Sequence, residues 1–144
     1  MPKILILYGS TTGNTEMVAE QIMSCLEEHE VDLQDVADAS QEDLASYDLL
    51  VVGASTWDDG KLQQDFRDFV DGLDVDLSDK KAAVFGLGDS TYPDFCKAAP
   101  ILEQIFTNLG AKLVVDALKI DGFPDEVENE EKIDAWSQEL AKQI

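Results

Sequence analysis

The stretch that decides the fold is Ile4–Glu16, I-L-I-L-Y-G-S-T-T-G-N-T-E, where an unbroken apolar run passes into hydroxyls, glycines and an amide. Apolar residues without polar alternation are typical of a strand buried on both faces, and such strands belong to parallel sheets covered by helices. Over residues 16–26 apolar positions then recur with helical spacing. The sequence therefore predicts a buried strand, a tight turn and a helix whose first N–H groups point back into the turn.

The turn between this strand and this helix is rich in short hydrogen-bond donors. Gly9 and Gly13 permit tight turning and close backbone approach. The donors around them are Ser10, Thr11, Thr12, Asn14 and Thr15. Together with a helix N-terminus they predict a binding site for an anion, most often phosphate. The alternative is a turn that only caps its helix, because Ser, Thr and Asn are common capping residues, but five donors exceed what a cap needs.

The turn matches neither of the two common nucleotide-binding loops. It lacks the Lys of G-x-x-x-x-G-K-[ST], and its glycines do not have the spacing of G-x-G-x-x-G. No Lys or Arg occurs from residue 4 to residue 60. A phosphate at this turn would therefore be held by neutral donors and the helix dipole.

Composition limits the class of protein. The 144 residues are the size of one domain, here expected to span residues 1–144. A net charge of −21, from 31 acidic and 10 basic residues, counts against nucleic acid or an anionic membrane as partner and favours basic proteins. Met1 and Pro2 lead into the first strand without a basic leader, and no apolar run reaches ~18 residues, so a cytoplasmic protein is expected. Two cysteines and one histidine predict no metal site.

Further strands and helices alternate along the chain. Apolar or alternating runs predict strands at residues 31–36, 49–54, 82–87 and 113–118. Helical spacing predicts helices at residues 66–73, 98–109 and 133–144, the last with Trp136 in its inner stripe, and a weak helical turn at 42–45. Five strands alternating with helices predict an α/β fold, a three-layer, doubly wound parallel sheet with helices on both faces.

Ligands of such sheets bind at the carboxyl ends of the strands. The loops expected there after the third and fourth strands, residues 55–60 and 88–96, contain Trp57 and Tyr92. A loop aromatic exposes apolar surface unless something flat covers it. The two residues are therefore predicted to be the walls of a site for a planar ring, and the alternative is that each folds back onto the core.

These motifs resemble those of the short-chain flavodoxins, over the whole chain. The resemblance rests on S-T-T-G-N-T-E from residue 10, S-T-W from residue 55 and G-D-S-T-Y-P-D-F-C from residue 88, in that order. It implies a five-stranded sheet in the order 2-1-3-4-5 with FMN between the first and third strands. It also implies a low-potential, single-electron carrier between redox partner proteins, without catalytic residues of its own.

The resemblance further implies a role for each site residue. The FMN phosphate would be held by the Gly13 backbone and by the side chains of Ser10, Thr11, Thr12, Asn14 and Thr15. Ser55 and Thr56 would lie beside the phosphate and ribityl chain, and Trp57 and Tyr92 would flank the ring. The pyrimidine edge of the ring would be lined by Asp89, with Leu87, Gly88, Phe95 and Cys96. Family members often carry Gly directly after the Trp, and its peptide reorients when the flavin is reduced. Here Asp58 and Asp59 intervene before Gly60, so that reorientation is either disfavoured or moved to the Asp59–Gly60 peptide.

The acidic charge has two expected consequences. Carboxylates near the ring should disfavour added negative charge on the flavin and lower its potential. Acidic segments at residues 58–71 and 121–131 should steer basic reductases and acceptors into weak, transient complexes with a monomeric carrier, although such charge can also serve solubility alone.

Two other functions compete with the electron carrier. An FMN-dependent NAD(P)H:quinone oxidoreductase needs an open ring face, which Trp57 and Tyr92 would block. A phosphorelay receiver domain needs an acidic pair after the first strand and an Asp at the end of the third. The sequence has Tyr8-Gly9-Ser10 and Gly53-Ala54-Ser55 at these places, which counts against a receiver domain.

Overall fold

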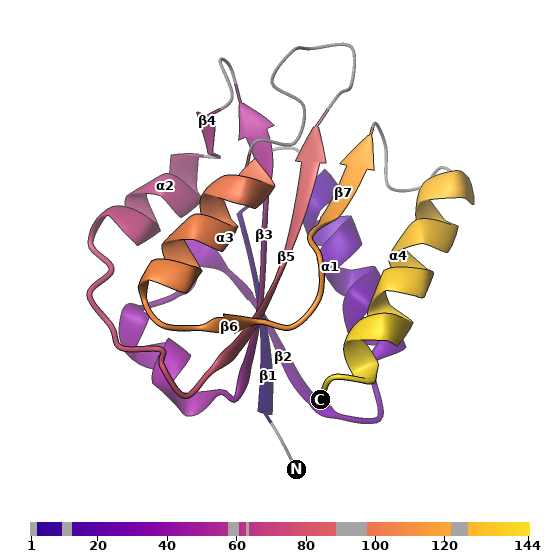
Figure 1. Cartoon of the computed structure of the whole chain (residues 1–144). Helices are drawn as coiled ribbons and strands as arrows, with labels where there is room; N and C mark the ends of the chain where they lie inside the picture. The colour runs from indigo at the N-terminus through magenta and orange to yellow at the C-terminus, as the bar shows by residue number, and fades with distance from the viewer. Residues whose placement is uncertain (1–2, 10–12, 58–60, 63, 89–97, 122–126) are drawn as a thin grey trace.

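The computed structural model describes residues 3–9, 13–57, 61–62, 64–88, 98–121 and 127–144 (Figure 1), with residues 41, 55–57, 61, 62, 64, 65, 88, 98 and 121 described by their backbone alone. The parallel part of its sheet has five places in the strand order. They are occupied by β2 (Glu30–Asp35), β1 (Lys3–Gly9), β3 (Leu49–Trp57), β5 (Lys81–Gly88) and, at the far edge, β6 (Lys112–Leu113) with β7 (Leu118–Asp121). Counting β6 and β7 as one strand, this confirms the predicted order 2-1-3-4-5.

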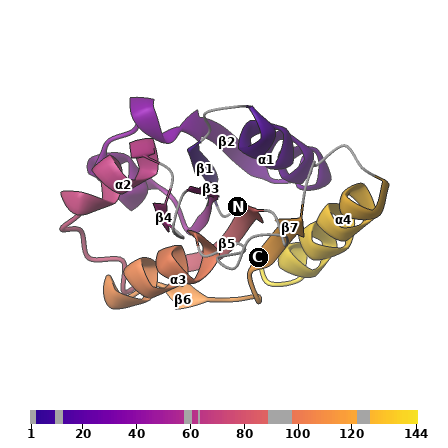
Figure 2. The ribbon, with the colours of Figure 1, turned by 90° about the horizontal axis from the view of Figure 1, so that it is seen from above.

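Helices cover both faces of the sheet (Figure 2). On one face lie α1 (Asn14–Cys25) and α4 (Val127–Ala141), and on the other lie α2 (Gln64–Asp71), α3 (Ala98–Asn108) and the 3₁₀ turns η1 (Val36–Asp38) and η2 (Gln41–Ser46). Every predicted helix is present. The boundaries differ most at α4, which begins six residues before the predicted start, and at α1, which includes two residues predicted to lie in the turn.

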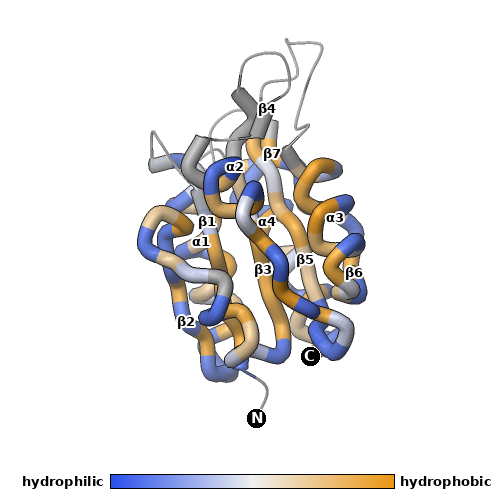
Figure 3. The backbone as a smooth tube through the Cα atoms, turned by 90° about the vertical axis from the view of Figure 1, so that its left-hand side faces the viewer, coloured by the Kyte–Doolittle hydropathy of each residue, from blue (hydrophilic) through white to orange (hydrophobic). Residues whose placement is uncertain are grey.

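Two hydrophobic cores, one on each face of the sheet, explain the unbroken apolar pattern of the strands. Leu5 and Leu7 pack with α2 and α3, while Ile4 and Ile6 pack with α1 and α4, and all four side chains are fully buried. Figure 3 shows the apolar strands running between helices with polar outer turns. Because neither face of β1 meets water, the prediction of a doubly covered strand is confirmed.

The third strand is longer than predicted. We expected residues 55–57 in a polar loop, but their backbone continues β3, and Thr56 and Trp57 pair with the two-residue antiparallel strand β4 (Lys61–Leu62). The hairpin gives Thr56 and Trp57 a partner strand that the local sequence does not reveal.

The last strand is interrupted rather than continuous over residues 113–118 as predicted. Leu113 pairs with Ala82 and Leu118 pairs with Phe85, so β5 advances three residues while the edge advances five. The two extra residues leave the ladder as a bulge, which splits the strand into β6 and β7.

Within the described ranges no helix is both long and apolar enough to cross a membrane. In the same ranges His, Cys, Asp and Glu side chains do not gather in a group of three that could hold a metal ion.

Candidate functional site

The sheet has its switch point between β1 and β3. The two strands pair in parallel from Ile4 with Leu49 to Gly9 with Ala54. From there the chain diverges, because β1 leads to α1 on one face and β3 leads through β4 to α2 on the other. Such a divergence opens a crevice at the carboxyl ends of the strands, where doubly wound sheets bind ligands.

The start of α1 lies at this crevice. Gly13 is its N-cap with a left-handed φ of 91°, and as a glycine it has no side chain of its own to cap the helix. A Cβ on Gly13 would have no atom within 4 Å, so the backbone conformation, rather than crowding, requires glycine. The first intrahelical bond runs from the Met17 N–H to the Gly13 carbonyl, at 3.1 Å. A helix N-terminus that begins at a glycine, just beyond the end of a buried strand, fits an anionic group such as phosphate.

A tyrosine and a glutamate join the end of β1 to this first helical turn. The Tyr8 hydroxyl donates a 2.6 Å hydrogen bond to Glu16 Oε2, and the Tyr8 side chain is 7% exposed. Burial, followed by the Glu16 carboxylate, raises the pKa of Tyr8 above the usual range. The Tyr8 hydroxyl therefore offsets part of the negative charge of Glu16, the only acidic residue in the first turn of α1. The sequence does not predict this pair, since residues eight apart across a strand, a turn and a helix form no known motif.

The second and third predicted loops begin beside each other. Ser55 on β3 is in register with Leu87 on β5, so the S-T-W segment and the segment that starts at Gly88 leave the same edge of the sheet. Behind them the Phe85 ring covers Gly53, where a Cβ would lie 2.2 Å from the ring. Leu87 is 4% exposed within the core on the α1 and α4 face, so its side chain serves packing and leaves mainly its backbone for a ligand.

The structure thus brings together part of the predicted site. Gly13, Asn14 and Thr15 lie at the start of α1; Thr15 is buried and Asn14 half-buried. Ser55, Thr56, Trp57 and Gly88 are placed by their backbone, at the ends of β3 and β5. Outside the described residues lie Ser10, Thr11, Thr12, Asp58, Gly60, Asp89, Tyr92, Phe95 and Cys96.

Comparison with known proteins agrees with this geometry. A family model described as flavodoxin matches residues 6–136. The flavodoxin of Maridesulfovibrio salexigens is 43% identical over the full length of both chains, and probable flavodoxin 2 of Bacillus subtilis is 38% identical over 99% of this chain and 96% of its own. The crystal structure of oxidised flavodoxin 2 from Bacillus cereus superposes with a TM-score of 0.95 and 41% identity, covering 99% of each chain.

These relatives confirm the resemblance seen in the sequence. They favour an electron carrier over the quinone reductase alternative. The chain therefore belongs to the flavodoxin family, proteins that bind FMN and carry electrons to redox partner proteins rather than act as enzymes.

Proposed function

We propose that residues 1–144 form one monomeric domain that carries single electrons at low potential on an FMN at the carboxyl ends of β1, β3 and β5. The observation that carries this proposal is the start of α1, whose N-cap is a left-handed glycine at the switch point of the sheet. Bound FMN supplies the redox chemistry, and the protein supplies binding, orientation and electrostatics.

The phosphate end of the site uses no positive side chain. The side chains of Ser10, Thr11, Thr12, Asn14 and Thr15 and the Gly13 backbone donate to the phosphate, together with the first N–H groups of α1. Two features support this arrangement. No Lys or Arg occurs from residue 4 to residue 60, and the Tyr8 hydroxyl donates to the Glu16 carboxylate, whose charge would otherwise oppose the phosphate.

The ring end of the site is enclosed by two aromatic side chains. Trp57 and Tyr92 flank the ring, and Ser55 and Thr56 lie beside the ribityl chain. Asp58 and Gly60 border the ring after Trp57. The pyrimidine edge of the ring is lined by Leu87, Gly88, Asp89, Phe95 and Cys96. The β3–β4 hairpin supports this placement, because pairing with Lys61 fixes the Trp57 backbone at the end of β3. Covered on both faces, the ring would exchange electrons through an exposed edge without a substrate pocket.

Net charge selects the partners. Lys3, Lys81 and Lys112 are the first residues of β1, β5 and β6, so these bases lie at the edge of the sheet opposite the proposed site. With a net charge of −21, the chain attracts basic reductases and acceptors. We place these weak, salt-sensitive complexes in the cytoplasm.

Comparing FMN with riboflavin tests the phosphate site, since riboflavin lacks only the phosphate. Thr12→Ala should weaken FMN binding to the apoprotein about fivefold, equivalent to one hydrogen bond of ~1 kcal/mol, and leave riboflavin binding unchanged. The matched control is Thr107→Ala, an exposed threonine on α3 that should change neither affinity. Equal losses for both flavins, or no loss for FMN, would contradict the proposed phosphate site.

A redox titration tests the electrostatic part. Asp89→Asn should raise the potential of the second reduction step, because it removes a carboxylate proposed to lie at the ring edge, and ~1.4 kcal/mol corresponds to about 59 mV for one electron. The control is Glu131→Gln, an exposed residue on α4. The same potential in both variants would show that the acidic charge is too distant to act on the ring.

A further inference from the structure

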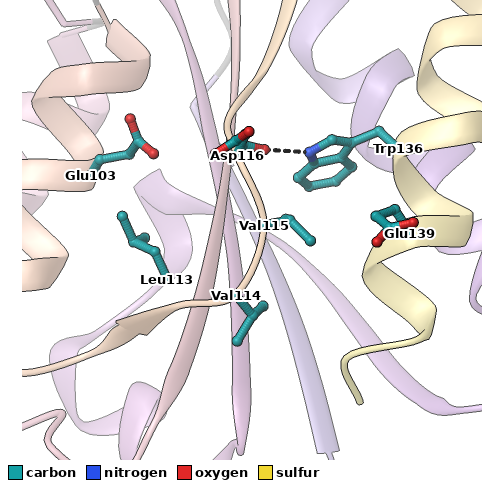
Figure 4. A pocket seen from close by; sticks show the side chains of 7 residues that line it. All are labelled: Glu103, Leu113, Val114, Val115, Asp116, Trp136 and Glu139. Atoms are coloured by element: carbon teal, nitrogen blue, oxygen red, sulfur yellow. Dashed lines mark hydrogen bonds between the residues drawn. The ribbon is translucent and has the colours of Figure 1, made fainter.

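An open groove of about 470 Å³ lies at the free edge of the sheet, between α3 on one face and α4 on the other (Figure 4). Its floor is the segment between β6 and β7. Four apolar side chains line it, Leu113, Val114, Val115 and Trp136, together with the three carboxylates of Glu103, Asp116 and Glu139.

The bulge in the edge strand creates this groove. After the Val114 N–H donates to the Ala82 carbonyl at 3.1 Å, the two extra residues carry the chain away from β5. The Trp136 indole N–H donates to the Asp116 carbonyl at 2.8 Å and holds the bulged segment against α4. Because the bulge breaks the ladder, this edge is poorly suited to pairing with another strand. An occupant must therefore be held mainly by its side chains.

The apolar floor remains partly open in the folded chain. Val114, Val115 and Trp136 are all half-buried, packed on one side against the core that α1 and α4 form with the sheet. A half-buried tryptophan beside two valines offers apolar contact area, and its ring face also attracts cations.

The walls and floor of the groove carry one sign of charge. Glu103 comes from α3, Asp116 from the floor and Glu139 from α4 (Figure 4). Among the described residues Glu103 and Asp116 form no ion pair, and Glu139 pairs only with Lys142, at 3.5 Å. Both side chains of that pair are more than half exposed, so it is weak and easily exchanged for another cation.

We propose that this groove binds a basic segment of a partner protein, in which apolar side chains alternate with arginine or lysine. The apolar side chains would contact Val114, Val115 and Trp136, and the cationic groups would pair with the three carboxylates. A second copy of this chain is a poor occupant, because two chains that each carry a net charge of −21 repel one another.

The position of the groove separates it from the proposed FMN site. Its floor runs past Ala82–Phe85, whereas the cofactor is proposed at the strand ends, near Gly88 on β5. A partner held here leaves the cofactor end open. The groove would therefore anchor the carrier to one protein while the flavin exchanges electrons with another, and its binding can be tested whether or not the proposed FMN contacts hold.

The test is an NMR titration of the ¹⁵N-labelled, FMN-loaded full chain with a hexapeptide of alternating arginine and leucine. The Trp136 indole N–H and the Val114 and Val115 amides should shift more than the amides of the first turn of α1. Glu103→Gln with Glu139→Gln should weaken the peptide about fivefold, as expected for the loss of two exposed ion pairs.

Two matched controls separate the groove from general charge attraction. Glu27→Gln with Glu28→Gln removes the same charge from exposed positions just after α1, outside the groove and outside the two acidic segments, and should leave the affinity unchanged. A hexapeptide of alternating arginine and serine should bind more weakly, since it lacks the apolar side chains. Equal loss in both double variants, equal affinity for both peptides, or shifts confined to the strand ends would each overturn the proposal.

Discussion

Replacing Tyr8 by Phe removes one oxygen atom from the junction of β1 and α1. The ring is 7% exposed and packs in the core on the α1 and α4 face, so Phe keeps its packing and loses only the 2.6 Å bond to Glu16. Hydrogen bonds to a charged partner contribute about 1.5–3 kcal/mol. Glu16 is half-buried and can turn toward water once it is released. We therefore expect the lower end of this range, a loss of ~1.5 kcal/mol in the free energy of unfolding.

Urea unfolding of the apoprotein measures this loss without a contribution from the cofactor. With a slope of about 1–3 kcal/mol/M, the midpoint should fall by roughly 0.5–1.5 M. Tyr47→Phe is the matched control, because the Tyr47 hydroxyl also donates a 2.6 Å bond, to Asp32 Oδ2, but Tyr47 is only half-buried and Asp32 is exposed. It should lose less, ~0.5 kcal/mol. Equal losses in the two variants would refute the reasoning that burial makes the Tyr8 bond the stronger.

A Glu16→Gln background adds a second check. In it Tyr8→Phe should cost less, because the bond to an amide oxygen lacks the charge that strengthens the bond to a carboxylate. If Tyr8→Phe costs the same in both backgrounds, the loss arises from packing rather than from this bond.

Two further predictions concern residues that are not among the proposed cofactor contacts. Gly53→Ala should lower the free energy of unfolding in urea by about 1–3 kcal/mol, because the added Cβ would lie 2.2 Å from the Phe85 ring. Gly72→Ala is the control, since its Cβ would have no atom within 4 Å, and it should change the free energy of unfolding by no more than ~0.5 kcal/mol. Equal effects would show that the Phe85 ring moves aside freely. The bond to Asp32, followed by burial, raises the pKa of Tyr47 to about 12, so the stability it contributes is complete below about pH 10 and lost as the pH rises through about 12. Asp32→Asn should return this pKa toward 10 in an NMR titration of the tyrosine ring carbons, and an unchanged value would exclude the carboxylate as the main cause.

Local sequence determined most of the fold. Unbroken apolar runs mark β1, β3 and β5 as strands buried on both faces, and apolar residues at helical spacing mark the buried side of α1 to α4. The strands, the helices and their order along the chain could therefore be predicted directly from the sequence. The donor-rich turn and the S-T-W and G-D-S-T-Y segments placed the proposed cofactor site at the ends of β1, β3 and β5. That the three segments lie close together follows without tertiary information, because parallel strands bring their carboxyl ends to one edge of the sheet.

Other features were decided only by tertiary contacts. Trp57 continues β3 because β4 pairs with it, and the bond between Tyr8 and Glu16 exists because α1 folds back beside β1. Trp136 has the spacing of an inner-stripe residue, but it lies at the margin of the core, where its indole N–H binds the bulged edge at Asp116. Periodicity reports whether a side chain is buried, whereas strand length, bulges and polar partners depend on which segment lies beside it in space, and that is a property of the assembled sheet.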